Sequence, residues 1–133
     1  GNAAQALRVL DYALAVDPDS IVANLPVGLR QRVEILKALT RDVRILVLDE
    51  PTAVLTPDES DELFRLMRQL RDAGVSILFI THKLREILAV TDRVSVMRRG
   101  EIVMEVETAA TSAAQLAEAM LGRKTSRATE RSL

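Results

Sequence analysis

A run of four apolar residues that ends in two adjacent carboxylates constrains the fold more than any other part of the sequence. Residues 45–48 (Ile-Leu-Val-Leu) lead directly into Asp49 and Glu50, and Pro51 and Thr52 follow. A continuous apolar run of this length is typical of a strand that is buried on both faces of a parallel sheet. An Asp at the carboxyl end of such a strand can reach Mg²⁺ held by a nucleoside triphosphate, and the next Glu can polarise a water molecule. The sequence therefore predicts a site for phosphate chemistry at this end of the strand.

A second apolar run, at residues 75–80, predicts a partner for this strand. It ends in Thr81 and His82, and His82 is the only histidine of the chain. Because the carboxyl ends of parallel strands meet at one edge of a sheet, we expect His82 to be delivered to the same edge as the two carboxylates. A lone histidine at a strand end is by itself more often a surface residue than a catalytic one. The prediction of a functional role for His82 therefore depends on the motif around it.

The segment between the two runs has the signals of an amphipathic helix. Thr56-Pro57-Asp58-Glu59 forms a capping box with proline at the first helical position. Gly74 is placed to end the helix as a C-terminal cap. An apolar stripe at helical spacing predicts the buried face, and its members are Leu63, Leu66, Met67 and Leu70. Strand, helix and strand then form a βαβ unit, for which we expect parallel pairing and a right-handed crossover.

The flanking segments predict further helices and a hairpin. The periodicity indicates helices over residues 3–16, 30–40 and 84–90 and strands over 93–97 and 101–106. Arg98-Arg99-Gly100 is a hairpin signal between these two strands, which we expect to finish the sheet. Ser112 and Gln115 predict a capping box for a last helix, with Leu116 and Met120 facing inward and Gly122 at its end.

Composition excludes several other classes of protein. The 133 residues carry a net charge of −1, which does not indicate a nucleic-acid partner. The chain has no cysteine, which excludes a disulfide framework and zinc held by thiolates. A hydrophobic content of 48% suffices for a packed core, yet no apolar run is long enough for a membrane span. We therefore expect a cytoplasmic globular domain or part of one.

Four motifs in a fixed order resemble the second half of the ATPase domain of ABC transporters. They are Leu-Pro-Val-Gly-Leu-Arg-Gln-Arg at residues 25–32, the Walker B-like segment 45–52, Ala-Val-Leu-Thr-Pro at 53–57, and Thr-His-Lys at 81–83. In detail they are similar to the first ATPase domain of tandem-domain importers for simple sugars and nucleosides. The resemblance implies an α/β fold, a partial P-loop NTPase domain with a mostly parallel sheet, flanking helices and a C-terminal β-hairpin. It also implies a signature-bearing helical region at 1–42, part of the nucleotide-binding core at 43–122, and a linker or tail at 123–133.

The resemblance assigns a role to each motif. Asp49 would hold Mg²⁺ through water, Glu50 would be the general base or water-orienting group, and His82 would contact the γ-phosphate of ATP as a switch. The D-loop, which would lie against a partner domain, comprises Ala53, Val54, Leu55 and Thr56. The signature, which would face the phosphate bound by the opposite domain, comprises Leu25, Pro26, Val27, Gly28, Leu29, Arg30 and Gln31.

Two departures from the family pattern affect these roles. The usual signature is Leu-Ser-Gly-Gly-Gln, whereas Pro26 and Val27 replace its serine and first glycine and Leu29 replaces its glutamine. This signature offers fewer phosphate donors, so its composite site would hydrolyse slowly or act as a binding clamp. The sequence also contains no G-x-x-x-x-G-K-[ST] loop. We therefore expect the Walker A half of the domain to be missing, and we expect these residues alone to bind Mg-ATP weakly or not at all.

The implied function is ATP-driven solute import. The expected partners are a second ATPase domain, transmembrane permease subunits and, indirectly, a solute-binding lipoprotein, at the inner face of the cell membrane. The open edge and apolar face left by the missing half predict self-association. Two alternatives stay open: a non-catalytic module that supplies only a signature and D-loop to a partner's site, and a nucleic-acid-linked ABC ATPase. Neutral charge argues against the second alternative.

Overall fold

The computed structural model describes residues 27–123, which belong to two compact units. The chain divides between Ile80 and Thr81, inside the region 43–122 that was predicted as one part of the nucleotide-binding core. The predicted helix over residues 3–16 and the tail after Arg123 lie outside the described residues. Each unit is described by itself below.

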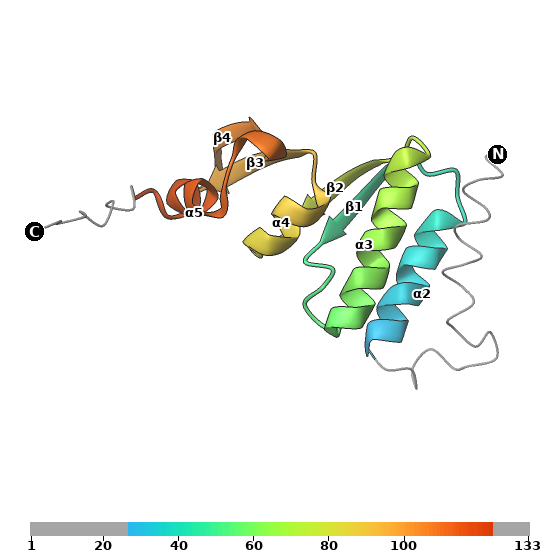
Figure 1. The fold of residues 1–133 in the computed structure, drawn as a ribbon. Coiled ribbons are helices and arrows are strands. Elements are labelled where there is room, and N and C mark those ends of the chain that lie inside the picture. Colours follow the sequence, from blue (N-terminus) through green and yellow to red (C-terminus); the bar gives the residue numbers. More distant parts are fainter. Residues whose placement is uncertain (1–26, 124–133) are drawn as a thin grey trace, which may run out of the picture. The chain divides into compact units, whose positions relative to one another are not determined.

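A strand, helix and strand form the centre of the first unit (Figure 1). Strand β1 (Ile45–Asp49) is followed by helix α3 (Pro57–Asp72) and strand β2 (Ser76–Ile80). The two strands pair in parallel, with Ile45 opposite Ser76 and Asp49 opposite Ile80. The predicted parallel pairing is therefore confirmed, and a helix precedes it as α2 (Val27–Leu39).

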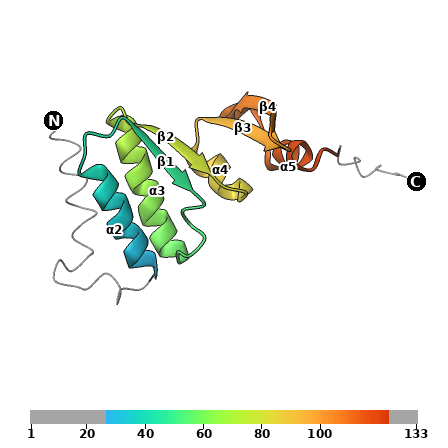
Figure 2. The ribbon, with the colours of Figure 1, turned by 180° about the vertical axis from the view of Figure 1, so that it is seen from behind.

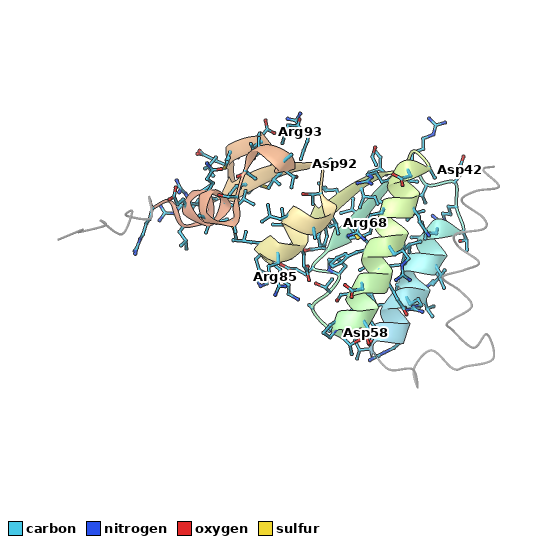
Figure 3. All side chains as sticks on the ribbon, in the orientation of Figure 1. Asp42, Asp58, Arg68, Arg85, Asp92 and Arg93 are labelled. Atoms are coloured by element: carbon cyan, nitrogen blue, oxygen red, sulfur yellow. The ribbon has the colours of Figure 1, made fainter. Side chains whose placement is uncertain are left out.

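Helix α3 begins and ends where the sequence predicts. The Thr56 hydroxyl accepts a hydrogen bond from the Glu59 backbone N–H at 3.2 Å. Asp58 and Glu59 both lie in the first turn, where a carboxylate interacts favourably with the helix dipole (Figure 3). At the other end Gly74 has a φ of +94°, a conformation that glycine adopts without strain. Its N–H bonds the Arg71 carbonyl at 2.9 Å and the next N–H bonds the Leu70 carbonyl at 3.0 Å, which is a Schellman motif.

One face of the first sheet is buried and the other is open. Leu46 and Leu48 of β1 are buried, and the ring of Phe79 in β2 packs edge-on against Phe64 of α3, with 6.2 Å between ring centroids. On the opposite face Ile45 is 69% exposed, and Val47, Leu78 and Ile80 are also exposed. The expectation that this strand is buried on both faces is wrong for the described chain, because α3 covers only the face that carries Leu46 and Leu48.

Helix α2 lies beside α3 and is joined to it by an ion pair. Ile35 and Leu39 are buried on α2, and they align with Arg32 three and seven residues before them. The Arg32 guanidinium, which is itself buried, bonds the carboxylate of Glu62 on α3. Both views of the ribbon show α2 and α3 side by side (Figures 1 and 2). The start of α2 is thereby held near the start of α3.

The second unit is a hairpin with helices packed on one face. Its elements are α4 (Leu84–Val90), β3 (Arg93–Arg98), β4 (Glu101–Glu107), the 3₁₀ turn η2 (Thr108–Ala110) and α5 (Ala113–Leu121). The predicted hairpin is confirmed, with antiparallel pairing and an irregularity in register after Val96. The expectation that these strands finish the first sheet is wrong, because the described strands form two separate sheets of two strands.

The core of the second unit lies between the hairpin and α5. Val94, Val96 and Leu116 are buried there, and Met120 packs against them. The Ser112 hydroxyl caps α5 by accepting a hydrogen bond from the Gln115 N–H at 3.3 Å, and Gly122 ends the helix with a φ of +70°. The predicted capping box, inward residues and terminal glycine of α5 are confirmed.

Candidate functional site

The two carboxylates of the strongest motif lie where β1 ends. Asp49 is the last residue of the strand, pairs with Ile80, and is exposed. Glu50 follows immediately, and its N–H donates to the Ile80 carbonyl at 2.8 Å, which extends the strand pairing by one bond. Both carboxylates therefore belong to the carboxyl end of β1, where the sequence places them.

Glu50 differs from Asp49 in conformation and burial. Its φ is +46°, in the left-handed region that non-glycine residues adopt at a cost of about 1–2 kcal/mol. Its side chain is partly buried, and the Oε2 atom is inaccessible to solvent. The chain therefore turns sharply directly after β1. The Glu50 carboxylate is packed against the protein and does not extend into water.

The predicted D-loop forms a tight turn between Glu50 and α3. The Ala53 N–H bonds the Glu50 carbonyl at 3.3 Å, and the Leu55 N–H bonds the Thr52 carbonyl at 3.1 Å. The Thr52 side chain is buried beneath this turn, whereas Ala53 and Val54 are exposed. Thr56 belongs at the same time to the turn and to the N-cap of α3. The exposed residues of the turn are available to a partner, and the buried ones fix its shape.

The described part of the signature lies beside this turn. A Cβ atom added to Gly28 would contact the Leu55 side chain at 3.3 Å and would collide with the Glu59 carboxylate. The first turn of α2 thus approaches the end of the D-loop and the start of α3, and glycine permits this close approach. An acidic side chain next to Gly28 opposes the binding of a phosphate there. Leu25 and Pro26 lie outside the described residues, and Arg30 is exposed on α2.

His82 belongs to the second unit. It lies two residues after β2 and is exposed, immediately before α4. The Thr81 hydroxyl accepts a hydrogen bond from the Lys83 N–H at 3.0 Å, which shapes the turn that carries the histidine. The first unit therefore contains Asp49, Glu50, the D-loop and the described part of the signature, and His82 belongs to the second unit.

Comparisons with known proteins agree with this set of motifs, although no protein-family model matches the chain. The glucose import ATP-binding protein TsgD13 of Haloferax volcanii is 58% identical over 113 residues, which are 85% of this chain and 20% of that protein. The nucleoside import ATP-binding protein NupA of Lactococcus lactis is 51% identical over 90% of this chain and 24% of its own length. This chain is homologous to the ATP-binding proteins of ABC transporters.

A solved ABC cassette shares the fold. The structure of MJ1267, an ATP-binding cassette of an ABC transporter, matches 86% of this chain with a TM-score of 0.70 and 26% identity, and the match covers 48% of that cassette. The chain therefore has the fold of part of an ABC cassette, and it spans between a fifth and a quarter of the two curated relatives. Among the described helices, none combines the length and the apolar character that crossing a bilayer requires.

The residues at the end of β1 are compatible with Mg-ATP. Within residues 27–123 no three acidic or histidine side chains gather into a metal site of their own. Mg²⁺ does not require such a cluster, since it is commonly held by one or two carboxylates together with phosphate oxygens and water. Asp49 supplies an exposed carboxylate of the required kind.

Sequence reasoning missed two contacts that organise the site. Arg32 and Glu62 were not singled out, although Arg32 falls on the buried stripe of α2 with Ile35 and Leu39, and a buried charge of this kind is a signal for an oppositely charged partner. Gln31 was predicted only as part of the signature. In the structure its side-chain Nε2 donates a hydrogen bond to the Pro51 carbonyl. No spacing or pattern in the sequence predicts this contact between α2 and the turn.

Proposed function

We propose that this chain is part of the ATP-binding subunit of an ABC importer, which couples ATP hydrolysis to the uptake of a simple sugar or a nucleoside. The observation that carries the proposal is the end of β1, where an exposed Asp49 precedes a Glu50 held in a fixed left-handed turn. The printed names of the relatives, which are import proteins for glucose, nucleoside and ribose, support the class of solute.

The roles in hydrolysis follow from the chemistry of the residues. Asp49 would hold Mg²⁺, which when bound neutralises charge on the phosphate oxygens. Glu50 would accept a hydrogen bond from the attacking water and orient it, which is the main requirement of in-line phosphoryl transfer. The anchored N–H of Glu50 keeps its backbone in place, so the carboxylate extends from a fixed position at the end of β1.

The remaining roles concern partners. His82 would contact the γ-phosphate, and the exposed Ala53 and Val54 would meet a second ATPase domain. Permease subunits in the membrane, and a solute-binding lipoprotein through them, would complete the importer, with this chain at the inner face of the membrane. The degenerate signature and the neighbouring Glu59 favour slow hydrolysis at the composite site that this signature completes.

A chimera tests the proposal. The chain replaces its matching 113-residue segment in the Haloferax volcanii relative, and ATP hydrolysis and solute uptake are measured. We expect activity, and we expect Asp49→Asn to lower it by about 10²-fold or more because the Mg²⁺ ligand loses its charge. Asp72→Asn, at the exposed end of α3, is the matched control and leaves activity unchanged.

The alternative function makes a different prediction in the same experiment. If the chain is a non-catalytic module that only completes a partner's site, the chimera hydrolyses ATP equally well with Asp49 or Asn at position 49. Titration of the 133-residue chain with Mg-ATP adds a second readout. We expect weak binding or none, since the sequence has no phosphate loop, and stoichiometric high-affinity binding would contradict that expectation.

A further inference from the structure

Three successive residues after β1, Glu50, Pro51 and Thr52, each have a backbone carbonyl that accepts a hydrogen bond. The Glu50 carbonyl is bonded by the Ala53 N–H and the Thr52 carbonyl by the Leu55 N–H, both from within the turn. The Pro51 carbonyl lies between them and is bonded by the side chain of Gln31, twenty residues earlier in α2. The middle carbonyl therefore depends on a second element of the fold.

The dependence on Gln31 is substantial because the turn is both buried and strained. Pro51 and Thr52 are buried, so a Pro51 carbonyl without its donor would carry a cost of about 1–3 kcal/mol. Glu50 occupies the left-handed region, and such residues persist only where the surroundings determine them. Loss of the donor would favour rotation of the peptide after Pro51 and relaxation of the turn.

We propose that Gln31 is a positioning residue that holds the Glu50-Pro51-Thr52 turn in the conformation needed for hydrolysis. The proposal rests on the proposed function, because it takes Glu50 as the group that orients water. Gln31 reaches the turn from a helix whose first residues are Val27 and Gly28, so the same hydrogen bond links the signature segment to the catalytic turn. A contact of the signature backbone with phosphate is compatible with this role, since the bond uses only the side chain.

Substitutions at Gln31 in the chimera test the role. Gln31→Met keeps the length and helix propensity of the side chain but removes the N–H donor. We expect kcat to fall by about 10- to 100-fold, since small displacements of a catalytic group have effects of this size, with little change in the KM for ATP. Gln31→Lys retains a donor of similar reach and should keep more of kcat than Gln31→Met. The matched control is Gln69→Met at a half-buried glutamine of α3, which should leave kcat unchanged.

A structural readout accompanies the kinetics. The Ala53 N–H closes the turn onto Glu50, so its hydrogen exchange should become faster in Gln31→Met and remain unchanged in Gln69→Met. Slower hydrolysis with faster Ala53 exchange supports the proposal. Unchanged kcat in Gln31→Met, a rise in KM alone, or loss of the cooperative melting transition overturns it, since the last two outcomes indicate ligand contact or a role in folding.

The two proposals fail in distinguishable ways. If the chimera is inactive, or if Asp49→Asn has no effect, the proposed function fails. If Asp49→Asn abolishes hydrolysis and Gln31→Met does not slow it, the proposed function stands and the positioning role of Gln31 is wrong.

Discussion

Two tight turns within residues 27–123 hold a non-glycine residue at positive φ, and they are stabilised in different ways. Arg99 has a φ of +52° and is followed by Gly100 at +79°, between the paired strands β3 and β4. Two central residues at positive φ are typical of a type I′ hairpin turn, whose twist matches that of the strands. Glu50 has a φ of +46°, but it lies between a parallel strand and a helix, where no hairpin ladder imposes that conformation.

The difference shows where strain is tolerated and where it is built in. At Arg99 the strain is local, the side chain is exposed, and the two strands enforce the turn. At Glu50 the conformation is held by the Ile80 carbonyl on one side and by Gln31 on the other, so two other elements of the unit maintain it. Strain maintained by distant contacts, at a residue that carries a carboxylate, points to function rather than to connection.

Detaching α2 from α3 should have the largest effect on stability. Arg32→Met keeps most of the buried aliphatic packing but removes the ion pair with Glu62, and we expect the free energy of unfolding to fall by about 1–3 kcal/mol. Lys37→Met is the matched control, because both partners of its ion pair with Glu34 are well exposed and such pairs contribute about 0–1 kcal/mol. Urea denaturation measures both. Equal effects would show that α2 does not depend on the ion pair between the buried Arg32 and the more exposed Glu62.

Replacing each strained residue by glycine or alanine should reveal the cost of its conformation. At both Glu50 and Arg99 we expect the glycine variant to be more stable than the alanine variant by about 1 kcal/mol, because only glycine adopts positive φ freely. At Arg65, an exposed position within α3, the order should reverse by about the same amount. Thermal unfolding of the six variants measures these differences. If the alanine variant at position 50 is as stable as the glycine variant, the turn relaxes and Glu50 is not held under strain.

Much of the fold could be predicted because its signals are local. The caps of α3 and α5 involve residues three positions apart, and the buried stripe of α3 repeats with the helical period. The parallel pairing of β1 with β2 followed from the strand, helix and strand order. The family resemblance also came from ordered motifs, and the similarity to importer ATP-binding proteins and to a solved ABC cassette confirms it.

The contacts that organise the site could not be predicted in the same way. The apolar runs of β1 and β2 do not indicate which face of the sheet is covered. In the described chain one face remains exposed at Ile45 and Leu78. The partner of Arg32 lies thirty residues away on another helix, and the Gln31 amide meets a backbone carbonyl that no side-chain pattern reveals. Such contacts depend on how helices pack, which spacing within one helix does not determine.

The most direct test of the central claim is ATP hydrolysis by the chimera with Glu50→Gln. The substitution preserves the size of the side chain but removes the carboxylate that would orient water. Because a positioned acid–base group contributes about 10²- to 10⁴-fold, we expect the single-turnover rate to fall by that amount while Mg-ATP still binds. Glu101→Gln, at an exposed glutamate of the hairpin, is the control and should leave the rate unchanged. A rate that is equal in Glu50→Gln and Glu101→Gln would contradict the assignment of this strained turn as the catalytic one.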